Sequence, residues 1–132
     1  MSNLTVMSSQ HFVSFMLSMG DEGSIGCHIP QSDAVEFVNC ARSLVNNKED
    51  FPEAEFETSS VNVEGMGAGD SVMFCFKNKG NEKKIQFAIE KDICRELVFK
   101  IQDGINTIIQ IHGPLEPCTR EKWKFFDFAK AV

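Results

Sequence analysis

The order strand, turn, strand, helix occurs twice along the chain and limits the folds that this sequence can adopt. In residues 13–47, two runs of alternating apolar residues flank a Gly/Asp turn, and a stretch with apolar residues at helical spacing follows. The same order returns in residues 72–111. Alternation with a period of two indicates half-buried strands, and such runs joined by a polar turn are typical of hairpins. One interpretation is an internal β-β-α duplication, and the other is chance repetition of a common order.

The inward-facing positions of the two units correspond at a nearly constant offset in residue number. The offset changes by one residue between the two strands, because the turn of the second unit is one residue longer. Few of the residues are identical, so the match is one of pattern. We therefore predict that the strands of each hairpin are adjacent and that both helices bury equivalent faces. The corresponding pairs are Val13 and Val72, Ile25 and Ile85, Ile29 and Ile89, Phe37 and Leu97, and Val38 and Val98.

Each predicted helix begins near an aspartate. Asp33 and Asp92 are residues of the type that caps helices, because the carboxylate accepts bonds from free backbone N–H groups. The second helix then meets Gly104, and a glycine inside a helix costs about 1 kcal/mol relative to alanine. Apolar residues keep helical spacing beyond it, so we expect the helix to continue to about residue 111. The alternative is a helix end at Gly104 and a strand over 105–111.

The segments outside the two units have their own patterns. Residues 48–70 form an acidic connection, in which 56–64 suggests an extra strand whose apolar positions change face at a bulge. Residues 65–70 have the composition of a flexible loop and lack the spacing of a phosphate-binding motif. After two prolines, a C-terminal helix is expected over residues 119–131.

Length and composition fit a single folded domain spanning residues 1–132. The chain is 42% apolar and 24% charged, which is ordinary for a globular protein. We expect the α+β class, with one antiparallel sheet of five or six strands and the helices packed mainly on one of its faces.

The sequence favours a cytoplasmic protein with no membrane partner. No apolar run approaches the roughly 18 residues that cross a bilayer, and the N-terminus lacks the features of a signal peptide. The cysteines are odd in number and contain no C-x-x-C pair, so we expect reduced, structural thiols. They are Cys27, Cys40, Cys75, Cys94 and Cys118.

The net charge of −6 is unevenly distributed. Residues 1–70 carry a net charge of −9 and residues 71–132 a net charge of +3. Six acidic side chains lie within residues 49–64, among them Glu53, Glu55 and Glu57. This segment is either a solvated loop or an acidic face that attracts a basic protein partner. The acidic total disfavours nucleic acid as a partner.

The sequence contains no local catalytic motif of the G-x-S-x-G or H-E-x-x-H type. A zinc site of Cys27, His28, His112 and Cys118 is disfavoured, because neighbouring residues of a strand point to opposite faces. We therefore expect a protein that is not an enzyme and has no cofactor or metal. An active site assembled from distant residues is the alternative.

The C-terminal segment concentrates aromatic side chains, with four within six residues. On the expected helix, Phe125 and Phe128 share one stripe, which would pack on the domain. Trp123 and Phe126 lie on another stripe, which would reach a partner or a second copy of the chain, since aromatic side chains are common interface anchors.

Three functions fit these observations. The first is a small acidic inhibitor or immunity-type protein that binds and blocks a basic toxin or nuclease. The second is an acidic chaperone or assembly factor acting as a homodimer, and the third is a small enzyme with a dispersed site. The predicted partner-binding residues are Glu53, Glu55, Glu57, Trp123 and Phe126.

Overall fold

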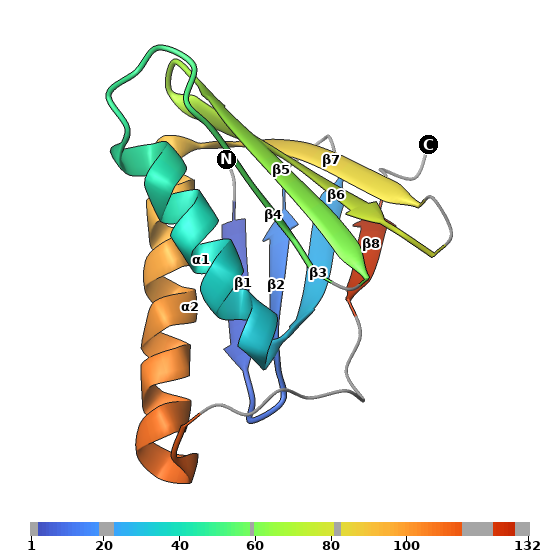
Figure 1. Ribbon diagram of the computed structural model, residues 1–132, viewed down its shortest axis with the longest axis vertical. Coiled ribbons are helices and arrows are strands. Elements are labelled where there is room, and N and C mark those ends of the chain that lie inside the picture. The colour runs from blue at the N-terminus through green and yellow to red at the C-terminus, as the bar shows by residue number, and fades with distance from the viewer. Residues whose placement is uncertain (1–2, 19–22, 59, 81–82, 115–122, 129–132) are drawn as a thin grey trace. The chain divides into compact units, whose positions relative to one another are not determined.

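The described part of the chain folds into two four-stranded antiparallel sheets and two helices, as the computed structural model shows (Figure 1). The structure describes all residues except 1–2, 19–22, 59, 81–82, 115–122 and 129–132. The α+β class is confirmed, but the expectation of one sheet of five or six strands is wrong. Each predicted hairpin gains further strands of its own, so two separate sheets form.

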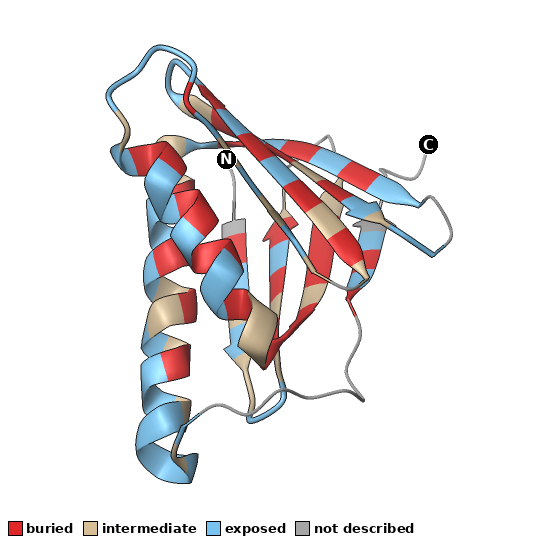
Figure 2. Cartoon of the chain, viewed as in Figure 1, coloured by how far each residue is buried: buried red, intermediate tan, exposed pale blue. Residues whose placement is uncertain are grey.

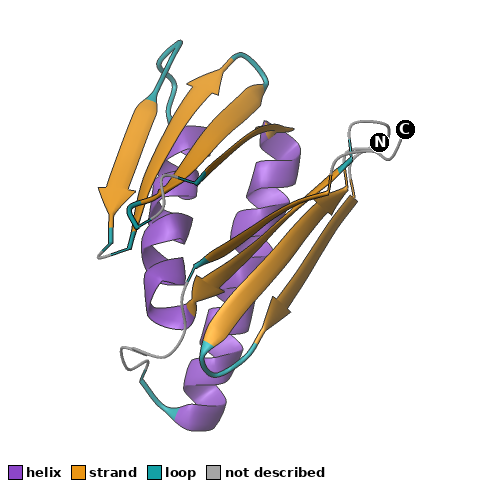
Figure 3. Ribbon diagram, turned by 90° about the vertical axis from the view of Figure 1, so that its right-hand side faces the viewer, coloured by secondary structure: helices purple, strands orange, loops and turns teal. Residues whose placement is uncertain are grey.

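Two compact units make up the chain. The first unit comprises Met1–Ala34 and Phe99–Val132, and the second comprises Val35–Val98. Both contain one sheet and part of each helix, because the helices span Gln31–Asn46 (α1) and Lys91–His112 (α2). Figure 3 shows the strands and helices from a second direction.

The sheet of the first unit has the strand order β1-β2-β3-β8. Its buried face is formed by alternate residues, as expected, with Val13, Phe15 and Leu17 buried along the second strand (Figure 2). Strand β1 was not expected, because Leu4 and Val6 alone give a short alternation. The strands are β1 (Asn3–Ser8), β2 (Phe12–Ser18), β3 (Ser24–Pro30) and β8 (Lys124–Phe128).

The sheet of the second unit has the order β4-β5-β6-β7 and packs against α1. Phe37 of α1 contacts Phe74 and Phe76, with ring centroids 5.4 Å and 5.6 Å apart. Phe87 contacts the same two rings, so four aromatic side chains form the centre of this core. The strands are β4 (Glu53–Glu57), β5 (Val61–Ala68), β6 (Ser71–Asn78) and β7 (Lys84–Glu90).

A turn, not a bulge, explains the change of face within the acidic connection. Phe56 belongs to β4, whereas Val61 and Val63 belong to β5, and the two strands pair antiparallel. Thr58 closes the turn between them, because its hydroxyl oxygen accepts a hydrogen bond from the backbone N–H of Val61 at 3.0 Å. Two strands therefore replace the single bulged strand that the sequence suggested.

The expectation of a flexible loop over residues 65–70 is also wrong. The first four of these residues complete β5, and only Gly69, with a φ of 60°, and Asp70 form a turn. A Cβ at Gly65 would lie 2.5 Å from Cδ1 of Leu44 on α1. The absence of a side chain at Gly65 leaves room for the Leu44 side chain to pack directly on the strand.

The helices confirm the predicted spacing, and α2 continues through residues 105–111, so the strand alternative is wrong. The aspartates do not precede the helices but lie in their first turns. Asp92 forms an ion pair with Arg95 at 2.8 Å.

In both predicted repeat units the two strands are paired and a helix follows directly, as a duplication requires. A common origin of the units stays a prediction.

Gly104 allows α2 to pack closely on β1. A Cβ at this position would lie 2.2 Å from Oγ and 2.8 Å from Cβ of Ser8. We expect Gly104→Ala to lower the free energy of unfolding by about 1–3 kcal/mol, because overpacking outweighs the higher helix propensity of alanine. Urea unfolding measures this difference.

Two further variants separate packing from propensity. Asn106→Ala, at an exposed position of the same helix, should change stability by about 0.5 kcal/mol or less. Ser8→Gly should recover part of the stability lost in Gly104→Ala. A Gly104→Ala protein as stable as the wild type would contradict the close approach.

Candidate binding groove on the second sheet

The strand register of the second unit brings side chains from four strands into two rows on the outward face of the sheet. Residues directly opposite one another on adjacent strands lie on the same face, with Cβ atoms roughly 5 Å apart. The first row contains Glu53, Met66, Met73 and Ala88, and the second contains Glu55, Glu64, Cys75 and Gln86.

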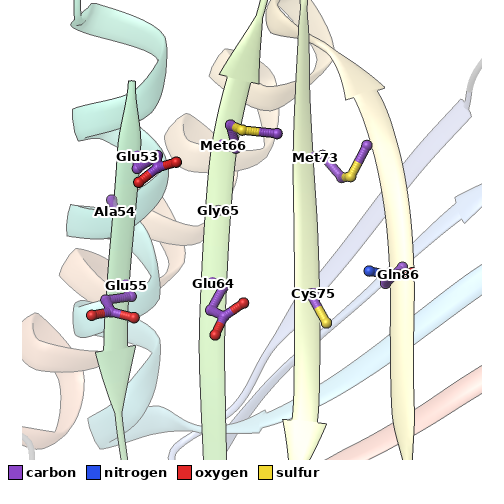
Figure 4. A pocket seen from close by; sticks show the side chains of 9 residues that line it. All are labelled: Glu53, Ala54, Glu55, Glu64, Gly65, Met66, Met73, Cys75 and Gln86. Atoms are coloured by element: carbon purple, nitrogen blue, oxygen red, sulfur yellow. The ribbon is translucent and has the colours of Figure 1, made fainter. Parts of the chain in front are cut away.

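An open groove of about 590 Å³ lies over these rows (Figure 4). All side chains of the two rows except Ala88 line it, together with Ala54 and Gly65. In Figure 4 the side chain of Met66 extends from β5 towards β6, the strand that carries Met73. The groove is therefore acidic towards β4 and rich in sulfur-containing side chains towards β6.

Three carboxylates on the acidic side have no ion-pair partner among the described residues. They are Glu53, Glu55 and Glu64; in contrast, Glu57 pairs with Lys79. Glu55 and Glu64 are directly opposite on neighbouring strands, and like charges in this arrangement destabilise a sheet. A cationic group bound beside the pair would interact favourably with both carboxylates.

The sulfur side presents flexible apolar groups to solvent. Met66 is 36% exposed and Met73 is 45% exposed, and the two are direct cross-strand partners. Methionine has a flexible, polarizable side chain that adapts to apolar groups of different shapes. Cys75 lies half-buried in the next row, between the longer side chains of Glu64 and Gln86.

The structure brings together part of the predicted acidic site. Glu53 and Glu55 line the groove, and Glu57 lies on the same edge strand outside it. The sequence analysis counted Glu64 in the acidic segment without naming it as a partner-binding residue, and it missed Met66, Met73, Cys75 and Gln86. The available signal was their alternation with buried residues along β5, β6 and β7, but only the register shows which of them are opposite one another.

The predicted C-terminal helix is wrong where the structure describes it, because residues 124–128 form strand β8 on the edge of the first sheet. Residues 119–122 and 129–131 lie outside the described residues. Alternation replaces helical spacing: Trp123 and Phe125 are buried, whereas Phe126 is 43% exposed. Aromatic residues favour strands, and W-K-F-F-D-F fits a period of two as well as a helix.

Trp123 and Phe126 therefore have different environments. The indole Nε1 of Trp123 donates a hydrogen bond to Oδ2 of Asp33 at 2.9 Å, and the ring contacts Phe125. Phe126 lies over Gly26 on the outward face, since a Cβ at Gly26 would be 3.6 Å from its ring. Of the two predicted partner-binding aromatics, only Phe126 has an exposed side chain.

The histidine on the first sheet has a local structural role. Nδ1 of His28 lies 3.0 Å from the hydroxyl of Ser14, and its ring is 4.4 Å from that of Phe12. His28 points away from the buried Cys27, as the alternation predicts. Among the described residues, no three or more His, Cys, Asp or Glu side chains are grouped so that they could hold a metal ion.

The described helices are also too short or too polar to cross a membrane. Comparisons with protein-family models, curated proteins and solved structures give no significant match to this chain.

The two neighbouring phenylalanines of β8 provide a matched pair of substitutions. We expect Phe125→Ala to reduce the free energy of unfolding by roughly 3–5 kcal/mol, because it leaves a cavity in the core. Phe126→Ala should cost about 1 kcal/mol or less, the contribution of an outward cross-strand contact. Thermal unfolding of both variants checks this. Equal destabilisation by the two changes would contradict the observed strand.

The thiols differ in accessibility. Cys40 and Cys94 are buried, as expected of structural thiols, and burial raises the pKa of their thiols to about 11 and about 12. For Cys94 the neighbouring Cys40 adds to this effect and Arg95 opposes it. Burial also raises the pKa of the Cys27 thiol well above its usual value.

Cys75 in the groove should therefore react with a water-soluble thiol reagent before the three buried cysteines. Reaction requires the thiolate and access to it, and burial reduces both. Timed labelling of the native protein at pH 8, followed by peptide mass mapping, ranks the sites. Labelling of Cys40 or Cys94 ahead of Cys75 would contradict the burial.

Proposed function

We propose that this protein is a non-enzymatic binding module whose acidic groove binds a basic protein. The concrete form of the proposal is an inhibitor or immunity-type protein that blocks a basic toxin or nuclease. The observation that carries it is the grouping of Glu53, Glu55 and Glu64 beside two exposed methionines, with no cation paired to these carboxylates among the described residues.

Protection of the sheet edge explains only part of this grouping. Charged residues on an edge strand discourage pairing with other chains, and this accounts for the glutamates of β4. Glu64, however, lies on the interior strand β5, where both edges are already paired. Its position opposite Glu55 adds nothing to the protection of the edge and instead supports a role in attracting a cationic partner.

A second candidate, a homodimeric chaperone or assembly factor, is favoured by apolar side chains on the outward face of the first sheet. Met16, Gly26 and Phe126 are direct neighbours across three strands, and Met16 is 45% exposed. Self-association through this face predicts a concentration-dependent mass in sedimentation that Phe126→Ala abolishes. A monomer at all concentrations favours the first candidate.

The glutamates of β4, the acidic strand, should act mainly on the rate of association with the partner. We expect Glu53→Gln/Glu55→Gln/Glu57→Gln to slow binding of a basic partner roughly tenfold at low salt and to flatten its salt dependence. Stability should change little, since exposed charges contribute little to it. The partner is captured from an extract of the source cells, identified, purified and measured in real-time binding.

A matched control removes the same charge elsewhere. Glu36→Gln/Glu90→Gln/Asp103→Asn changes three exposed acids that do not line the groove. This control should bind at close to the wild-type rate. If both triple variants slow association equally, the effect is one of net charge, and the acidic strand is not the binding site.

A further inference from the structure

We propose that the groove recognises an extended basic segment of the partner, in which an arginine is followed two residues later by a large apolar side chain. This inference rests on the proposed function and specifies the chemistry of its partner. It follows from the positions of the two carboxylates and the two thioethers on adjacent strands.

The acidic side fits a guanidinium group. Glu55 and Glu64 are directly opposite each other on β4 and β5, so both carboxylates project from the same face of the sheet (Figure 4). A guanidinium is planar and offers five N–H donors, which allows it to bond both carboxylates at once. A lysine ammonium is a more strongly hydrated point charge and lacks this geometry.

The apolar side fits an aliphatic or aromatic side chain. Met66 and Met73 are opposite each other on β5 and β6, one row away from the glutamate pair and one strand across. Strand spacings of about 4.8 Å and 3.3 Å per residue place the centres of the two pairs about 8 Å apart. Residues i and i+2 of an extended segment project on one side about 7 Å apart, which matches this separation.

Cys75 adds space where the bound segment would cross the sheet. It lies between Glu64 and Gln86 in the second row, and its short side chain leaves room above the sheet. Neither the methionines nor Cys75 would be needed by a surface that attracts cations through charge alone. Their presence in the same groove supports recognition of a segment over nonspecific attraction.

Labelled peptides test the inference with the full-length chain. The probe is the heptapeptide Gly-Ser-Arg-Ser-Leu-Ser-Gly, and binding is measured by fluorescence polarisation at low salt. Replacing its arginine by glutamine, or its leucine by serine, should weaken binding roughly tenfold in each case. Moving the leucine next to the arginine, with composition unchanged, should weaken it similarly, because the two side chains then project on opposite sides.

Variants of the protein identify the site. Glu55→Gln/Glu64→Gln should remove the preference for the peptide arginine, and Met66→Gln/Met73→Gln should remove the preference for its leucine. Glu36→Gln/Asp103→Asn is the control with the same charge change and should bind as the wild type does. If the methionine variant fails to fold, the leucine-to-serine peptide makes the same comparison on unchanged protein.

The outcomes separate the two proposals. If affinity follows peptide charge alone and ignores leucine and its spacing, the segment inference is overturned while charge-driven binding stands. If the probe does not bind, yet a basic protein is captured through the glutamates, the inference is again overturned and the proposed function stands. If neither the peptide nor any basic protein depends on these glutamates, both are wrong.

Discussion

The close packing of α1 on the buried face of the second sheet determines what its opposite face presents. Gly65 accommodates Leu44, and Phe37 fits against Phe74 and Phe76, so the inward positions of β5 and β6 are fixed by shape. Because successive side chains alternate between faces, fixing one face also fixes the other. A slip of one residue in β5 would bury Glu64 and Met66 and expose Val63. The groove is therefore a consequence of the core beneath it.

The same alternation explains how far the sequence predicts this fold. The hairpins and helices follow from local periodicity, which is why the burial of Val13, Val72 and Leu97 is predicted correctly. The division into two sheets depends instead on pairings between distant segments, such as β3 with β8. Nothing in the local pattern of either segment encodes such a pairing. A bulge and a turn both move the apolar residues of a segment to the other face of a sheet. The local pattern therefore does not distinguish the turn at Thr58 from the expected bulge.

The candidate site was only partly predictable for a related reason. Charge density identified Glu53 and Glu55, because a cluster of acids is visible in the sequence itself. The importance of Glu64 lies in its position opposite Glu55, and that of Met66 in its position opposite Met73. These relations require the register of three strands. The prediction for the aromatic segment, residues 123–128, was wrong for another reason. Its sequence fits both the helical period and the strand period, and only the pairing of β8 with β3 decides between them.

The hydrogen bond between Trp123 and Asp33 joins residues 90 positions apart, where β8 begins and α1 starts. The chain contains one tryptophan and no tyrosine. Its intrinsic fluorescence under selective excitation therefore arises from this single indole, buried beside a carboxylate. The fluorescence of Trp123 therefore reports whether β8 is packed in the first unit. The groove lies in the other unit and has no such chromophore, so its occupancy must be followed with a label on the ligand.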